Sequence, residues 1–211
     1  MDDRQIYWED VGFLHYKFND DELQFIRDEV NKIKKSPSDY VRWNRELAGN
    51  LEHEYKISPD VYDKLYDLLI PLEKAYYDIF SDFRGSGDVC VNEVDTVVDN
   101  AWVNFQKKYE FNPPHVHKGV FSFVIWLDIP YTHNDELKTP HAAAALAKRS
   151  GAFSFFYLSP NGNIRERPIY ADKEYRNTVL FFPAKLMHCV YPFYTSDGER
   201  ISVSGNIVYK T

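Results

Sequence analysis

WVNFQKKYEFNPPHVHKGVFSFVIW, residues 102–126, contains two runs of aromatic and β-branched residues separated by a Pro-Pro pair and a glycine. Runs of this composition predict strands, here at 96–107 and 120–127. His115 and His117 lie two residues apart where a further short strand is expected to start, so both imidazoles should point to the same face. Two imidazoles on one face are typical of two ligands to one metal ion.

Short runs of β-branched and aromatic residues continue on both sides of this segment, from about residue 89 to the end of the chain. More short strands are predicted at 115–116, 152–158, 178–182 and 201–209. Short strands joined by turns, with no helices between them, indicate an antiparallel sandwich or barrel. Residues 131–150 interrupt the pattern with mixed charge and an alanine run, and we interpret them as a partly helical lid.

The N-terminal part of the chain is helical in pattern. Residues 21–35 place apolar side chains at helical spacing, and Asn19, Asp20 and Asp21 precede them as candidate caps. A longer helix is predicted from Ser58-Pro59 to Phe80, because serine before proline is a common helix start. We therefore expect residues 1–88 to form a helical support region of the same domain as the β core, residues 89–211.

Composition excludes several classes of protein. The chain has 211 residues, 44% of them hydrophobic, which argues against intrinsic disorder. The net charge of −7 disfavours a nucleic-acid binder, and no window is apolar enough to cross a membrane. The acidic N-terminus does not look like a signal peptide, so a cytoplasmic location is expected. Two cysteines, Cys90 and Cys189, are interpreted as buried free thiols.

A third histidine completes a candidate metal site. His188 lies in FFPAKLMHCVYP, at the end of a predicted apolar strand, and Arg200 follows twelve residues later at the head of the last strand. Each residue alone is more often structural than functional. Together, His115, His117 and His188 supply three ligands and leave room for substrate and O₂ on Fe(II), and Arg200 offers a two-pronged donor for a carboxylate.

These residues resemble the Fe(II)- and 2-oxoglutarate-dependent oxygenases, and within them the prolyl-hydroxylase-like proteins of marine bacteriophages. The resemblance is carried by NRELAGNLEHEY, WVNFQKKYEFNPPHVHKGVFSFVIW and LFFPAKLMHCVYPFYTSDGERISVSGN. It implies a double-stranded β-helix, a cupin-like jelly roll, that binds Fe(II), 2-oxoglutarate and O₂. The resemblance also implies that His115 and His188 bind iron, that Arg200 anchors the 2-oxoglutarate C5-carboxylate, and that Ser202 assists it.

Position 117 departs from the family pattern, which has aspartate or glutamate there. A three-histidine site including His117 is the simplest interpretation. Alternatively, His117 lies behind the ligands and an acidic residue from elsewhere, such as the 131–150 segment, completes the site. Trp102, Asn104 and Gln106 share one face of their strand, opposite Val103 and Phe105. Asn104 is therefore a candidate contact for the C1 end or ketone of 2-oxoglutarate, or else makes an ordinary buried hydrogen bond.

The reaction implied by the resemblance is oxidative decarboxylation of 2-oxoglutarate to succinate and CO₂, coupled to hydroxylation of a C–H bond. Prolyl residues in a peptide are the substrate favoured by the resemblance, whereas a free amino acid, nucleoside or sugar fits the composition equally well. The location would be the host cytoplasm if a phage encodes the chain. Two alternatives stay open: another jelly-roll enzyme with a three-histidine site, of the thiol dioxygenase or isomerase type, and a non-catalytic binding module.

Overall fold

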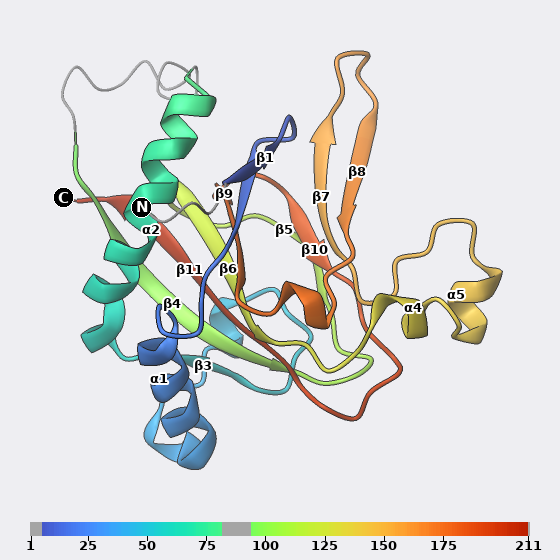
Figure 1. The fold of residues 1–211 in the computed structure, drawn as a ribbon, viewed down its shortest axis with the longest axis horizontal. Helices are drawn as coiled ribbons and strands as arrows, with labels where there is room; N and C mark the ends of the chain where they lie inside the picture. The colour runs from blue at the N-terminus through green and yellow to red at the C-terminus, as the bar shows by residue number, and fades with distance from the viewer. Residues whose placement is uncertain (1–5, 82–93, 211) are drawn as a thin grey trace.

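The computed structural model describes residues 6–81 and 94–210, whose strands form two antiparallel sheets (Figure 1). The seven-stranded sheet has the order β1 (Tyr7–Glu9), β2 (Phe13–Lys17), β9 (Thr178–Pro183), β6 (Phe121–Asp128), β11 (Arg200–Tyr209), β4 (Thr96–Gln106) and β3 (Glu54–Lys56). The four-stranded sheet has the order β5 (Asn112–His115), β10 (His188–Val190), β7 (Phe153–Leu158) and β8 (Ile164–Ile169). This arrangement confirms the predicted mainly β fold with a jelly-roll core.

Two helices cover the outer face of the larger sheet (Figure 1). They are α1 (Gln24–Lys35) and α2 (Tyr62–Ile79), close to the predicted positions. The shorter helices are η1 (Pro37–Asp39), η2 (Asn44–Glu46), η3 (Pro59–Val61), α4 (His133–Glu136), α5 (Pro140–Ala144) and η4 (Lys173–Tyr175). Ser58 caps η3, since its hydroxyl accepts from the Asp60 N–H at 3.4 Å. Before α1, Asn19 and Glu22 exchange side-chain to backbone hydrogen bonds instead of capping the helix itself.

Strand β6 shows why the chain forms two layers of core. Phe121, Phe123 and Ile125 point toward the helices, whereas Val124 and Trp126 point into the space between the two sheets. This alternation is the period of a strand that is buried on both faces. Fully burying a side chain of this size stabilises the fold by about 1.5–3 kcal/mol, so both layers contribute to holding the sheet.

Five short strands were not expected from the sequence. Strands β1, β2 and β3 come from the region before residue 89 and extend both edges of the larger sheet, because β2 pairs with β9 and β3 pairs with β4. The N-terminal region therefore supplies strands as well as helices. Strand β8 forms a protruding hairpin with β7 (Figure 1), and β10 lies between β5 and β7.

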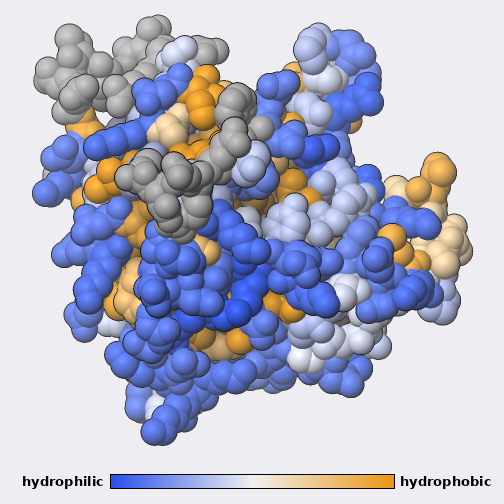
Figure 2. Space-filling model, in the orientation of Figure 1, coloured by the Kyte–Doolittle hydropathy of each residue, from blue (hydrophilic) through white to orange (hydrophobic). Residues whose placement is uncertain are grey.

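The segment 131–150 is partly helical, as predicted, because it contains α4 and α5. Figure 2 shows the face in view covered mainly by hydrophilic residues, with an apolar area over α5 and the residues after it, where Leu146 is fully exposed. Cys189 is a buried free thiol, whereas Cys90 lies outside the described residues. No helix among the described residues is long and apolar enough to cross a membrane.

Candidate metal centre

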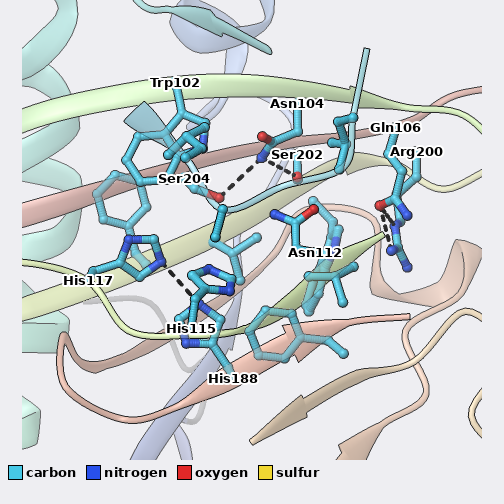
Figure 3. Close-up of a pocket in the computed structure, with 18 of the residues that line it drawn as sticks. Trp102, Asn104, Gln106, Asn112, His115, His117, His188, Arg200, Ser202 and Ser204 are labelled. Atoms are coloured by element: carbon cyan, nitrogen blue, oxygen red, sulfur yellow. Dashed lines mark hydrogen bonds between the residues drawn. The ribbon is translucent and has the colours of Figure 1, made fainter. Parts of the chain in front are cut away.

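Three histidines meet at one end of a cavity between the two sheets (Figure 3). The ligand nitrogens of His115, His117 and His188 all lie within 4.8 Å of one another. The Nε2 atoms of His117 and His188 are 3.1 Å apart. Two nitrogens bound to one metal ion at ~2.1 Å and at right angles to each other would be about 3.0 Å apart. This spacing therefore suits joint coordination of one ion.

Backbone carbonyls set the tautomer of two of these rings. His115 Nδ1 lies 2.7 Å from the Pro113 carbonyl oxygen, and His188 Nδ1 lies 2.9 Å from the Leu186 carbonyl oxygen. Because a carbonyl only accepts, each Nδ1 carries a hydrogen and donates it. The lone pair of each ring is then on Nε2, which faces the other histidines and is free to bind a metal.

Burial keeps the three imidazoles neutral. Desolvation lowers the pKa of His115, and desolvation together with the nearby His115 lowers the pKa of His117 to about 3. Desolvation and the two other histidines place the pKa of His188 well below its usual value. A metal binds only deprotonated ligands, so this cluster is in its binding form at neutral pH.

The local structure around the histidines differs from the sequence prediction. Strand β5 ends at His115 instead of beginning there, and His117 follows it in a loop, where its N–H donates to the Ala184 carbonyl. As an edge strand, β5 accommodates Pro113 and Pro114, which lack the N–H that an inner strand needs. His188 begins the separate strand β10, directly opposite His115, instead of ending β9. Pairing between strands, not a shared strand face, brings these histidines together.

Arg200 lies at the opposite end of the cavity from the histidines, at the start of β11 as predicted (Figure 3). Its Nε and Nη2 donate to Gln106 Oε1 at 2.9 and 2.6 Å, and its Nη1 donates to Tyr131 Oη at 2.6 Å. The Gly151 and Tyr191 carbonyls accept its other N–H groups at 2.8 and 3.2 Å.

Arg200 is only 2% exposed, and a charge buried to this extent is expected to have a counter-ion. Its hydrogen-bond acceptors are nevertheless all neutral. Within the described part of the chain no carboxylate forms an ion pair with its guanidinium. A buried charge without a counter-ion is costly. This end of the cavity is therefore suited to an anionic ligand, which would exchange with one or more of the neutral acceptors.

The remaining predicted site residues also line the cavity. Ser202 faces it beside Arg200, and the Asn104 amide donates from Nδ2 to the Ser202 hydroxyl at 3.2 Å and to the Ser204 hydroxyl at 3.5 Å. Asn104 Oδ1 has no hydrogen-bond partner although the residue is buried. The cavity therefore contains a free acceptor midway between the histidines and Arg200 (Figure 3).

Several lining residues were not assigned from the sequence. Leu47, Ala48 and Leu51 form a wall from the loop before β3, and Asn112 of β5 faces them. The loop lies inside the NRELAGNLEHEY block, one of the three blocks that resemble the oxygenase family, but the sequence did not indicate that its residues line the cavity. Gln106 was seen only as part of an alternating strand, and its contact with Arg200 depends on side-chain direction.

The 131–150 segment contributes little to the cavity. Among the described residues none of this segment lines it, and Tyr131 reaches the site only through Arg200. The buried Glu136 of α4 accepts from the Ser150 hydroxyl and from the N–H groups of Tyr194 and Thr195. The metal-binding cluster within the described residues contains histidines and no carboxylate, so no acidic residue of this segment joins it.

Comparison with protein families gives one match. Residues 100–206 match the family described as putative 2OG-Fe(II) oxygenases, whose members use Fe(II), 2-oxoglutarate and O₂. The site fits these groups, because three neutral imidazoles lie together and a buried guanidinium without a counter-ion lies at the other end of the same cavity. No curated protein sequence matches the chain.

Solved structures with the same fold include several oxygenases. A prolyl-4-hydroxylase from Pseudomonas putida is 11% identical, with a TM-score of 0.52 over 95% of this chain and 94% of that one. A prolyl hydroxylase from Trichoplax adhaerens, in complex with a hypoxia-inducible-factor peptide, is 12% identical, with a TM-score of 0.52 over 95% and 84%. The α-ketoglutarate-dependent epimerase SnoN of nogalamycin biosynthesis is 13% identical, with a TM-score of 0.54 over 95% and 79%. At these identities the likeness establishes the fold alone.

Proposed function

This chain belongs to the 2OG-Fe(II) oxygenase family, and we propose that it is a hydroxylase that oxidises a C–H bond of a prolyl-type substrate with release of succinate and CO₂. The observation that carries the proposal is the pairing, in one cavity, of three neutral histidines with a buried arginine that has no counter-ion. A metal and a dicarboxylate would fill the two ends of that cavity.

His115, His117 and His188 would hold the iron. When bound, iron and 2-oxoglutarate supply the oxidation of the C–H bond. The chain's own contribution begins with the Pro113 and Leu186 carbonyls, which orient two of the ligand rings. Three imidazoles leave the full charge of the ion uncompensated, so anionic ligands are attracted more strongly than at a site that contains a carboxylate.

Arg200 would bind the C5-carboxylate. Its N–H groups now donate to Gln106, Tyr131 and two carbonyls, all of which are neutral. A carboxylate would give the guanidinium a charged acceptor that binds two of its N–H groups at once. Ser202, on the same strand and facing the same cavity, is a second donor for this group. Trp126 and Phe182 close the apolar wall of the cavity and limit access of water to the reacting end.

Substrate and biological setting belong to the same proposal. The Trichoplax relative in complex with a peptide supports a peptide substrate for this chain, with proline as the first residue to test. We propose in addition that the protein is similar to the prolyl-hydroxylase-like proteins of bacteriophages. We also propose that it works in the cytoplasm, where thiols such as Cys189 stay reduced. Residues 1–88 would act as a support for residues 89–211 within one domain.

The proposal is tested by adding Fe(II) and 2-oxoglutarate to the full chain without oxygen and recording the visible charge-transfer band of their complex. Wild type should show the band, whereas His188→Ala should lose it with the metal and Arg200→Ala should lose it with the cosubstrate. Circular dichroism of each variant checks folding. A folded, iron-loaded wild type without the band would contradict the proposal.

Adding oxygen to the same samples and measuring succinate separates the alternatives. A wild type that binds iron but turns over no 2-oxoglutarate, measured as succinate, would favour another three-histidine enzyme of the thiol dioxygenase or isomerase type. A wild type that retains no divalent metal would favour a non-catalytic binding module.

A further inference from the structure

Buried acceptor oxygens without partners are concentrated beside the cavity. Of six buried side-chain atoms that lack a hydrogen-bond partner among the described residues, four are oxygens of this region: Asn44 Oδ1, Glu54 Oε1, Asn104 Oδ1 and Asn112 Oδ1. Glu54 is 0% exposed and Asn104 is 7% exposed. Buried polar atoms are nearly always hydrogen-bonded, so this concentration indicates a group that is bound there.

The four side chains are close neighbours. Glu54 of β3 is directly opposite Asn104 of β4, so their side chains share the face that looks into the cavity. The Asn44 amide donates to Glu54 Oε2 at 3.2 Å. A Cβ added to Gly49 would lie 3.0 Å from Glu54 Oε1 and 3.2 Å from Asn112 Oδ1, so both oxygens lie beside Gly49 and close to each other.

The acceptor character of this group of side chains is well defined. Asn44 Nδ2 donates to the Leu51 carbonyl at 2.7 Å, to the Glu52 carbonyl at 3.5 Å and to Glu54, which requires its Oδ1 to be the free atom. The Glu54 carboxyl offers acceptors unless it is protonated. Such a group of oxygens is suited to a partner with several N–H groups.

The charge of the region favours a cation as that partner. Burial and the neighbouring Glu110 raise the pKa of Glu54 to about 7. A carboxylate surrounded by acceptors is unfavourable, so the carboxyl retains a proton until a better donor arrives. Arg200, the one lysine or arginine among the described lining residues, donates to Gln106, Tyr131 and two backbone carbonyls instead of to these oxygens (Figure 3).

We propose that Glu54, Asn112 and Asn44 form a recognition site for a cationic nitrogen, an amine or guanidinium, carried by the substrate that is oxidised. The proposal rests on the proposed function, since it places this substrate in the cavity that holds the metal cluster. Asn112 lines the cavity and contacts the N–H groups directly, whereas Glu54 supplies the negative charge beside it. Cation binding would release the Glu54 proton to solvent.

The test uses small probes in matched pairs. N-butylguanidine is compared with N-butylurea, and n-butylamine with 1-butanol, by calorimetry at millimolar concentrations near pH 7. Each is titrated into the full chain loaded with Fe(II) and 2-oxoglutarate without oxygen, and into the metal-free chain. We expect each cation to bind about tenfold or more tightly than its neutral partner. Titrations in two buffers of different ionisation enthalpy should show proton release.

Three variants locate the binding. Glu54→Gln keeps the shape of the side chain, and we expect it to abolish both the preference for cations and the proton release. Gly49→Ala places a methyl group between Glu54 and Asn112 and should weaken cation binding. Glu52→Gln, which removes an exposed carboxylate two residues away, should behave as wild type. The charge-transfer band with Fe(II) and 2-oxoglutarate should be unchanged in Glu54→Gln.

The outcomes distinguish this proposal from the proposed function. Equal binding of charged and neutral probes, no binding of either cation, or an unchanged preference in Glu54→Gln would each overturn the recognition site and leave ordered water as the partner of these oxygens. If the wild type shows no charge-transfer band with Fe(II) and 2-oxoglutarate, the oxygenase proposal is overturned instead. Cation binding to the metal-free chain would still decide the recognition site.

Discussion

His117 is the position at which this chain departs from the usual motif of its family, and its surroundings are those of a ligand. Its Nε2 lies 3.1 Å from that of His188, and burial holds its pKa near 3. The ring also packs against Trp102, with 5.5 Å between ring centroids, so its position is set by the fold. A histidine that only supported the site would not need its Nε2 among the ligand atoms.

Substitution at this position tests the ligand role. His117→Ala should weaken Fe(II) binding by about 10–100-fold or more, since one of three ligands is lost. His117→Asp supplies the carboxylate of the family motif and should restore much of that affinity. His133→Ala, a histidine outside the cluster, is the control and should bind as wild type. Oxygen-free titration with Fe(II) measures all three, and full affinity in His117→Ala would exclude direct ligation.

Glu54 should make the stability of the chain depend on pH in an unusual direction. Its pKa is about 7 in the folded chain and 4.5 in a model peptide, so the folded chain holds a proton that the unfolded chain releases. Stability is therefore highest below pH 4.5 with respect to this group and falls as pH rises to about 7. The full effect is at most about 3 kcal/mol.

Urea unfolding of Glu54→Gln at pH 5 and pH 8 measures this effect. The free energy of unfolding of the variant, relative to that of wild type, should be higher at pH 8 than at pH 5. Glu52→Gln should keep a constant difference from wild type over this range, because a hydrogen bond from Lys107 lowers the pKa of the exposed Glu52, which is therefore ionised at both values of pH. An identical difference between Glu54→Gln and wild type at both values of pH would show that Glu54 titrates normally.

Residue type and spacing were enough to select the histidines and Arg200 as candidates, because few residues perform metal and carboxylate chemistry, and the structure brings them into one cavity. The same reasoning could not find Glu54. A glutamate in the polar run EHEYK is ordinarily exposed, and its burial depends on β3 pairing with β4 some fifty residues later. Gln106 was similarly hidden, since a glutamine has no distinctive chemistry until its carbonyl is seen against Arg200.

At the scale of elements, α4 is held by one buried carboxylate. Glu136 is 0% exposed and accepts from the N–H groups of Tyr194 and Thr195 and from the hydroxyls of Ser150 and Thr195. These bonds join the 131–150 segment to the turn before β11. The α4 end of the segment is thus fixed, and Arg149 and Ser150 hold its other end through Glu166 and Glu136, so any movement of a lid would be confined to α5 and residues 145–148.

Glu136→Gln should therefore destabilise the chain. The amide replaces one acceptor oxygen by a donor that faces backbone N–H groups, and we expect a loss of roughly 3 kcal/mol, or about 6–12 °C in Tm. Asp135→Asn, at an exposed neighbouring position in α4, should cost less than about 1 kcal/mol. Differential scanning calorimetry of both variants gives the comparison, and equal Tm values would show that α4 is held by other contacts.

Element prediction succeeded where a pattern extended over many residues. The apolar spacing of α1 and α2 and the long aromatic runs of β4, β6 and β11 were sufficient. It failed for β3 and β10, three-residue strands that are too short to show a period, and for β8, whose IRERPI sequence carries the charges of an exposed edge. Pairing with neighbours, not local composition, creates these strands.

At the scale of the whole molecule, the metal site joins distant parts of the chain. The three clustered histidines come from β5, β10 and the loop after β5, while Arg200 begins β11 in the other sheet. An unfolded chain cannot present these groups together, so metal binding should stabilise the fold. At a metal concentration of one hundred times Kd the gain is about 2.7 kcal/mol, or roughly 5–11 °C in Tm.

Protonation sets the pH range of this stabilisation. All three histidine pKa values lie below 6.5 in the folded chain, whereas an unfolded chain takes up these protons near pH 6.5. Stability contributed by these groups is therefore complete above pH 6.5 and declines as pH falls toward the lowered values. His117 and His188, whose pKa values are about 3 and well below the usual value, stay neutral in the upper part of that interval, so protons should compete with the metal at these two residues much less than at an exposed histidine site.

Most of the metal-dependent rise in Tm at pH 7 should consequently remain at pH 5.5, although both the metal-free and the metal-loaded chain melt at lower temperature at pH 5.5. Thermal unfolding without oxygen, with and without Fe(II) at each pH, measures the two effects separately. An exposed site of three histidines would lose most of its affinity over this range, because each ligand must first release a proton. A rise that disappears at pH 5.5 would therefore mean that the histidines are more accessible to water than the buried cluster requires, and that the cavity opens in solution.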